Sequence, residues 1–125
     1  FLHMRGFGQA CHLGVLCGIP CLGVAKKLLY ADGITDQYVQ DEFRRAKGRD
    51  TALLIGESGV ERAYAYKARH NKGTSVLYIS AGHDISLRTS MDVVRLTMKG
   101  NELPEPVFQA DHLSREFLRL NYSNL

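Results

Sequence analysis

The apolar run Cys21–Ala25, "CLGVA", constrains the fold of this chain more than any other feature. Every residue in it is small or apolar, and the run is short. This pattern is typical of a β-strand covered on both faces, although periodicity alone does not exclude a segment of buried helix. The run ends at two adjacent lysines, Lys26 and Lys27. A chain that sends such a strand through its interior is expected to cover it with helices, as in α/β domains.

Length and composition limit the chain to one domain. With 125 residues and 45% hydrophobic residues, it can bury a single core. The net charge of +3 is compatible with a polyanionic partner without requiring one. The chain opens on "FLHMRGFG" without an initiator methionine. We therefore expect residues 1–125 to be a single partial domain whose amino-terminal part is missing.

Cysteine usage and hydropathy bear on the location of the protein. Cys11, Cys17 and Cys21 are an odd number of cysteines in or beside apolar sequence, so we expect reduced, buried thiols in an intracellular protein. Cytoplasm, nucleus and nucleolus all remain open. The longest apolar run, Leu13–Ala25, is shorter than the roughly 18 residues of a membrane span, and Gly18 interrupts it. No association with a membrane is expected.

Periodicity predicts helices and strands in alternation. A helix over Phe7–Cys17 is expected to stop at Gly18, and a final helix is expected from about Ala110, after an extended loop held by Pro104 and Pro106. The other expected elements are a helix within Asp32–Asp50, a hairpin of Ala52–Ile55 and Val60–Ala68 around Ser58-Gly59, a strand at Val76–Ser80, and a helix from a Ser86 cap to a Gly100 stop. Together they predict one α/β domain in which helices flank a mixed sheet.

Three polar residues lie where such a domain holds its ligands. Ligands of open α/β sheets gather outside the carboxyl ends of strands, where Lys26 and His83 follow apolar runs. Asp111 is expected at the start of the last helix. Each has a structural alternative: Lys26 as a solvated strand end, His83 as a partner of loop backbone, and Asp111 as a helix cap.

The remaining histidine and cysteine pattern does not indicate a metal site. His12 lies within an otherwise apolar helix pattern and is expected to be a hydrogen-bonded core histidine rather than a ligand. Its spacing from Cys11, Cys17 and Cys21 is not that of zinc ligands.

Four blocks of sequence carry a family resemblance. They are "LHMRGFGQACHLGVL" (Leu2–Leu16), "IPCLGVAKKLL" (Ile19–Leu29), "LYISAGHDISL" (Leu77–Leu87) and "LPEPVFQAD" (Leu103–Asp111). In this order and spacing the chain resembles the endonuclease V family, its eukaryotic branch in particular. Four blocks in register are more specific than any one of them.

The resemblance implies a ribonuclease-H-like fold and a Mg²⁺-dependent endonuclease. Such an enzyme cuts RNA, or single-stranded or duplex DNA, on the 3′ side of inosine, one phosphate removed, a reaction of DNA repair. Lys26 matches a lysine beside the scissile phosphate, where a fixed cation stabilises the charge that builds on the phosphoryl oxygens. Lys27 matches no catalytic position. Asp111 matches a position that supports or coordinates the metal.

The resemblance also assigns residues to substrate binding. His3 matches a histidine that follows the family's metal-binding carboxylate, and Arg5, Gly6, Phe7 and Gly8 match the loop near the flipped base. A glycine at position 8 would let the backbone approach hypoxanthine closely. His83, in the third block, is expected to contact the substrate.

Departures from the family pattern limit what the chain should do alone. In the family, most of the carboxylates that ligate the metal lie before the position that matches Phe1. A lysine and one aspartate cannot form a magnesium site by themselves. We therefore expect the isolated chain to be inactive. Asp84 and Phe108 replace residues that are usually basic, which predicts weaker phosphate contact. The alternative is a non-catalytic nucleic-acid-binding remnant or an unstable truncated product.

Overall fold

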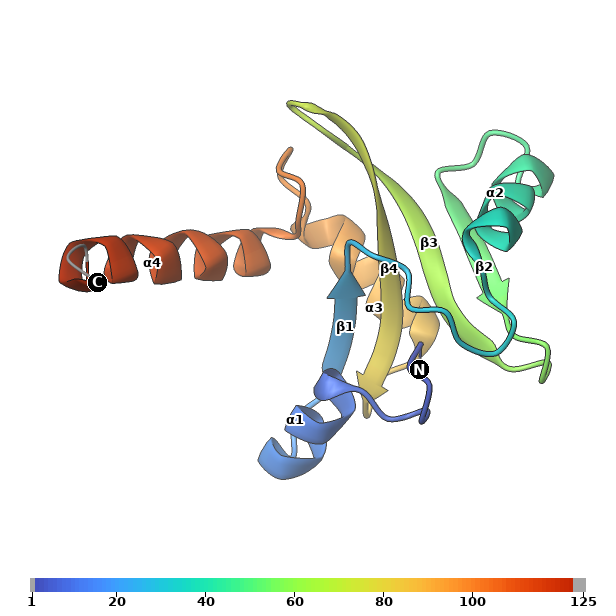
Figure 1. Ribbon diagram of the computed structural model, residues 1–125, viewed down its shortest axis with the longest axis horizontal. Coiled ribbons are helices and arrows are strands. Elements are labelled where there is room, and N and C mark those ends of the chain that lie inside the picture. Colours follow the sequence, from blue (N-terminus) through green and yellow to red (C-terminus); the bar gives the residue numbers. More distant parts are fainter. Residues whose placement is uncertain (1, 123–125) are drawn as a thin grey trace.

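The computed structural model describes residues 2–122, which form a four-stranded sheet with helices on both faces (Figure 1). The strands are β1 (Cys21–Ala25), β2 (Thr51–Ile55), β3 (Glu61–His70) and β4 (Gly73–His83). Their order is β1-β4-β3-β2, and all three neighbouring pairs are antiparallel. The predicted α/β class is confirmed. A mixed sheet needs at least one parallel pair of strands, and the described residues contain none. In this part of the chain the sheet is therefore antiparallel and not mixed.

Two helices cover opposite faces of the sheet because the strands alternate their side chains. Val39 of α2 (Asp36–Arg45) packs with Leu54 of β2 and Ala65 of β3. On the other face, Val94 of α3 (Leu87–Thr97) packs with Leu77 of β4. The domain therefore has a small core on each side of the sheet.

The strand β1 has the predicted bounds but a different environment. It pairs only with β4, at an edge of the described sheet, and four of its five residues are half-buried. The expectation of full cover on both faces is wrong for these residues. The expectation of three buried thiols is also wrong: Cys11 is buried, Cys21 is half-buried and Cys17 is exposed.

The helix α1 (Gln9–Cys17) ends as predicted at Gly18, whose φ of 64° lies in the left-handed region that favours glycine. Gly14 of α1 lies directly against His83 of β4, and no side chain would fit there. His12 is exposed, with its ring 6.3 Å from that of Phe7. The prediction of a core histidine is therefore wrong, because His12 faces away from the sheet side of a helix that packs through Gly14.

The predicted hairpin and the cap of α3 are confirmed. Ser58-Gly59 lies in the turn between β2 and β3, and the Ser86 side chain accepts a hydrogen bond from the Thr89 amide. β4 begins at Gly73, earlier than the Val76 expected, because it continues as a long ribbon paired with β3.

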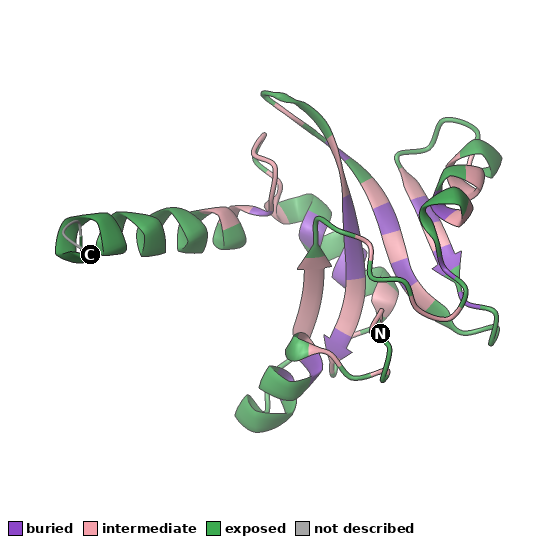
Figure 2. Ribbon diagram, in the orientation of Figure 1, coloured by how far each residue is buried: buried purple, intermediate pink, exposed green. Residues whose placement is uncertain are grey.

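The last helix, α4 (Glu105–Tyr122), starts five residues before the predicted Ala110. Pro106 lies in its first turn, where an amide would have no intrahelical partner and the proline ring is tolerated. α4 projects from the sheet and none of its described residues is buried (Figures 1 and 2). Among the described helices, none has the length and apolar character needed to cross a membrane.

Candidate functional site

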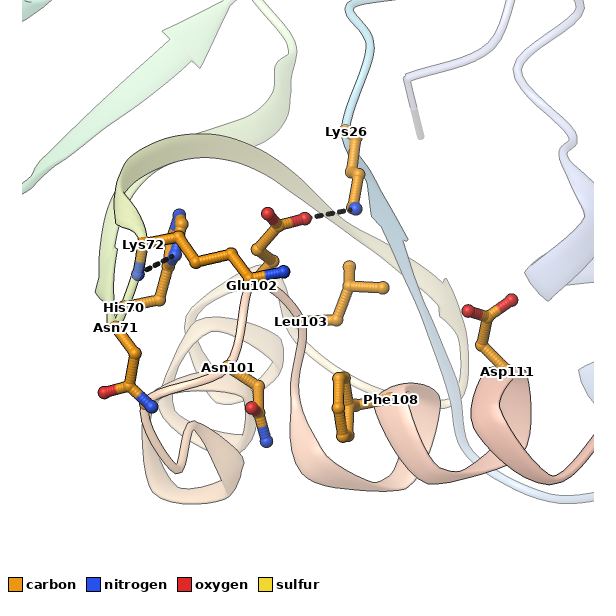
Figure 3. A pocket seen from close by; sticks show the side chains of 10 residues that line it. Lys26, His70, Asn71, Lys72, Asn101, Glu102, Leu103, Phe108 and Asp111 are labelled. Carbon is orange, nitrogen blue, oxygen red and sulfur yellow. Dashed lines mark hydrogen bonds and ion pairs between the residues drawn. The ribbon is translucent and has the colours of Figure 1, made fainter.

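A pocket of about 240 Å³ lies at the carboxyl end of β1 (Figure 3). Its walls are the end of β1, the turn between β3 and β4, the loop before α4 and the first turns of α4. It is lined by Lys26, His70, Asn71, Lys72, Gly100, Asn101, Glu102, Leu103, Phe108 and Asp111. We call it the Lys26 pocket.

Lys26 is held in place by a carboxylate. Its Nζ donates a hydrogen bond to Glu102 Oε2 at 2.8 Å, and the two side chains are 50% and 41% exposed. This hydrogen bond and the charge of Lys26 lower the pKa of the Glu102 carboxyl. Because both side chains are this exposed, the ion pair contributes little to the stability of the fold. Its main effect is to orient the ammonium group of Lys26. Since an ammonium group has three donors, Lys26 retains donors for an anion in the pocket.

The β3–β4 turn adds two further basic side chains. His70 and Lys72 both line the pocket and also lower the Glu102 pKa through their charge, less than Lys26 does. The turn is anchored to the loop before α4, because the Asn71 amide donates to the Gly100 carbonyl at 3.0 Å. This contribution was not predicted from the sequence. The Asn71-Lys72-Gly73 turn signal was visible, but the pairing that brings it to Lys26 was not.

Asp111 faces the same pocket from the second turn of α4 (Figure 3). Its two carboxylate oxygens each accept from Arg115 Nε at 3.0 Å. Asp111 is therefore not the helix cap that its expected position suggested. The structure brings Lys26 and Asp111, the two predicted catalytic residues, to one pocket.

The residues present do not complete a magnesium site. Glu102 and Asp111 are the two carboxylates that line the pocket, and Glu102 is bound to Lys26. Within residues 2–122, no group of three or more His, Cys, Asp and Glu side chains is arranged to hold a metal ion. Mg²⁺ prefers a shell of hard oxygen ligands, of which Asp111 could supply one.

His83 does not lie near Lys26. Cys21 pairs with His83 and Ala25 pairs with Tyr78. His83 therefore lies at the start of β1 and Lys26 directly after its end, about 16 Å apart along the strand. The expectation that the two strand ends meet at one edge is wrong, because it assumed that the strands run parallel. His83 instead packs against Gly14 of α1.

The predicted base-binding loop lies apart from the Lys26 pocket. His3, Arg5 and Gly6 border a hollow of about 520 Å³ that also contacts Arg62. Gly8 and His3 border a second hollow of about 220 Å³. Phe7 is 50% exposed beside this loop. Lys27 lines the second hollow and not the Lys26 pocket, so the adjacent lysines serve different surfaces.

The two departures from the family pattern lie in different places. Phe108 lines the Lys26 pocket beside Asp111, so an apolar ring stands where a basic side chain was expected to contact phosphate. Asp84 follows β4 with a φ of 45°, in the left-handed region. It lies at the His83 end of that strand, away from Lys26.

Comparison with known proteins decides the family. Residues 1–112 match the model of the Endonuclease V family. The chain belongs to the endonuclease V family. It is 46% identical to mouse endonuclease V over 128 residues, which cover 99% of this chain and 37% of the mouse protein. The chain thus spans less than half the length of this relative.

Solved structures of endonuclease V share the fold. The catalytic domain of human endonuclease V superposes with a TM-score of 0.85 at 40% identity, covering 98% of this chain and 50% of that one. Ciona intestinalis endonuclease V, in complex with a 24mer DNA containing an inosine followed by a ribo-adenosine, gives 0.84 at 35% identity, covering 95% and 51%. The predicted ribonuclease-H-like fold is confirmed by these neighbours.

Proposed function

We propose that this chain is part of an endonuclease that cuts RNA or DNA on the 3′ side of inosine, one phosphate removed. Membership of the endonuclease V family supports this, as does the Ciona relative, whose structure holds inosine-containing DNA. The observation that carries the proposal is that Lys26 and Asp111 line one open pocket at the end of β1. The activity would serve repair of inosine-containing nucleic acids inside the cell, in the cytoplasm, nucleus or nucleolus.

Lys26 would stabilise the scissile phosphate. Negative charge builds on the phosphoryl oxygens during transfer, and a fixed cation lowers the energy of that state. Glu102 orients the Lys26 ammonium group before the substrate arrives. A phosphate that enters the pocket would then replace or share this carboxylate, since both are anionic oxygen acceptors.

Mg²⁺ is the proposed cofactor, and Asp111 would be one of its ligands. When bound, the metal would polarise the phosphate. The other ligands would come from carboxylates outside this chain, because the described residues do not complete the site. We therefore propose that the 125-residue chain alone binds nucleic acid without cutting it.

The loop before α1 would contact the flipped base. Gly8 has a φ of −97°, which any residue can adopt, and a Cβ built on it would lie 3.9 Å from the nearest atom, His3 Cβ. The protein itself thus leaves room for a side chain at Gly8. Its proposed role is to leave that room to hypoxanthine, with His3, Arg5, Gly6 and Phe7 around it.

The test compares two matched 24-nucleotide strands, one with a single inosine and one with adenosine at that position, as RNA and as DNA. The protein that carries this chain together with the family's carboxylates is expected to cut only the inosine strand, with Mg²⁺. The 125-residue chain is expected to bind the inosine strand more tightly and to leave it intact. The proposal would be contradicted if the longer protein cut the inosine and adenosine strands at equal rates and the 125-residue chain bound them with equal affinity.

A second candidate is a nucleic-acid-binding module without catalysis. The absence of a metal cluster among the described residues favours it. It would be supported if the longer protein bound inosine strands selectively but did not cut them at any Mg²⁺ concentration.

A further inference from the structure

A second, basic groove lies on the same face of the sheet as α3. α3 packs on β3 and β4 but has no extensive contact with β2, which leaves the outer part of this face open. The resulting groove has a volume of about 450 Å³. Its walls include Arg49, Thr51, Leu53, Tyr64, Arg88 and Arg95. We call it the arginine groove.

The three arginines come from different parts of the chain and differ in how they are held. Arg95 donates to Asp50 Oδ1 at 2.7 Å, and its guanidinium lies 5.8 Å from the Tyr66 ring centroid. Arg49 and Arg88 are exposed, and among the described residues neither forms an ion pair. Two guanidinium groups therefore face the groove with all their donors available.

The acids near the groove do not neutralise it. Asp50 is bound to Arg95, and Asp92 lines the wall without an ion pair among the described residues. Three arginines against two aspartates leave a local excess of positive charge. Planar guanidinium groups suit phosphate oxygens in particular, because they donate two parallel hydrogen bonds.

We propose that the arginine groove binds the phosphodiester backbone of the substrate strand at a distance from the cleavage site. This inference rests on the proposed function and names a second contact with the same substrate class. Phosphates are favoured over an acidic peptide because the substrate strand already passes through the Lys26 pocket and needs only to continue along the same face.

The register of the sheet sets the distance between the two sites. Ala25 pairs with Tyr78, so the next residue, Lys26, lies level with Leu77 and, on β3, with Tyr66. Tyr64, which lines the groove, is two residues from Tyr66, about 7 Å along the strand, and two strands from β1, about 10 Å across the sheet. The backbones of the two sites are therefore about 12 Å apart. A stacked strand advances about 3.4 Å per nucleotide, so the groove meets a phosphate about four nucleotides from the one at Lys26.

The test measures binding of the 125-residue chain to single strands with one inosine, by fluorescence anisotropy. One series shortens the flank on the 5′ side and another on the 3′ side, one nucleotide at a time. The variant is the double substitution Arg49→Ala and Arg88→Ala, chosen because neither side chain makes an ion pair among the described residues. Arg44→Ala with Arg45→Ala on α2, on the opposite face of the sheet, is the matched control for the loss of two charges.

The wild-type chain should lose affinity at least tenfold when one flank, on one side only, falls below about four nucleotides. The groove variant should bind long strands as weakly as short ones, with a salt slope shallower by about 1.4, the expectation for two lost phosphate contacts on a single strand. The control variant should keep the flank dependence. Thermal unfolding of all three proteins checks that the fold is retained.

Two results would overturn the proposal. One is a groove variant whose flank dependence equals that of the control. The other is a variant that binds long strands normally but loses binding to a polyglutamate peptide, which would assign the groove to an acidic protein partner. A third result concerns the proposed function alone. If the wild-type chain bound inosine and adenosine strands equally but kept its dependence on flank length, the proposed function would be contradicted, and the assignment of the groove to phosphate binding would stand.

Discussion

Asp32 ties the loop after β1 to the β2–β3 hairpin. Its carboxylate accepts hydrogen bonds from the Ser58 amide at 3.1 Å, the Ser58 hydroxyl at 2.5 Å and Arg62 Nε at 2.7 Å. The hydrogen bonds from Ser58, and then that from Arg62, lower the pKa of the Asp32 carboxyl below its ordinary value of 3.8. A lowered pKa in the folded state means that the ionised carboxylate stabilises the fold.

We predict that Asp32→Asn lowers the free energy of unfolding at neutral pH, and that this loss shrinks in acid. The contribution of Asp32 is fully present above about pH 3.8 and is lost as the pH falls through the lower folded-state pKa. Asparagine keeps the shape and tolerates the φ of 54° at this position. Urea unfolding from pH 7 to pH 2.5 checks this; a constant difference between the two proteins would contradict it.

Gly8 offers a second test at the scale of one residue. Gly8→Ala should leave the melting temperature within about 2 °C, because the new Cβ meets only ordinary contacts. If Gly8 makes room for hypoxanthine, the same variant should weaken binding of the inosine strand at least tenfold. Gly14→Ala is the contrasting control: its Cβ would overlap His83, so it should destabilise the fold by about 1–3 kcal/mol. Normal inosine binding by Gly8→Ala would remove the proposed role.

Local signals predicted single residues well where the neighbouring chain decides their position. The cap at Ser86, the stop at Gly18 and the turn at Ser58-Gly59 depend on residues within one turn, and all are confirmed. The position of Asp111 within the last helix was wrong by about one and a half turns, because α4 starts at Glu105 and not at about Ala110. A proline in the first turn of a helix looks, in sequence alone, like a proline in an extended loop.

At the scale of elements, strand direction was the information that the sequence lacked. The bounds of β1 were predicted correctly, but whether it runs parallel or antiparallel to β4 depends on contacts far apart in the chain. This single choice separates His83 from Lys26 and brings the β3–β4 turn to Lys26 instead. Glu102 and Lys72 were missed for the same reason.

The helix α4 differs from α3 in how it is stabilised. Both carry apolar side chains at helical spacing, but Met91 and Val94 of α3 are buried, whereas Leu113 and Phe117 of α4 are 59% and 58% exposed. Among the described residues, α4 has no extensive contact with another helix or strand. Most helices in proteins depend on tertiary packing for their stability.

We predict that amides of α4 beyond its first turn exchange with solvent far faster than those of α3 in the 125-residue chain. The expected difference in protection is at least 100-fold, since opening α4 exposes no buried surface. Hydrogen exchange followed by mass spectrometry checks this, with α3 as the internal control. Equal protection of both helices would show that α4 packs against something in solution, such as a second copy of the chain.

At the scale of the whole molecule, the chain holds one part of a larger family fold. It covers about half of the solved endonuclease V structures it resembles. It contains the lysine, one aspartate, the loop proposed to bind the base, and a basic groove. Its described residues lack a complete set of metal ligands. Binding of nucleic acid and cleavage are therefore expected to separate, with binding retained by this chain and cleavage dependent on the further carboxylates.

The most direct test of this account compares Lys26→Ala with Lys27→Ala in the protein that carries this chain together with those carboxylates. The two lysines are adjacent, but only Lys26 lines the pocket with Asp111. Lys26→Ala should reduce kcat for cleavage of an inosine strand about 100- to 1000-fold, the effect of removing one group that stabilises transition-state charge. Lys27→Ala should change kcat less than about threefold, and any effect should fall on KM, because Lys27 lines the hollow beside Gly8 and His3. Equal rates for the two variants would contradict the assignment of the scissile phosphate to Lys26.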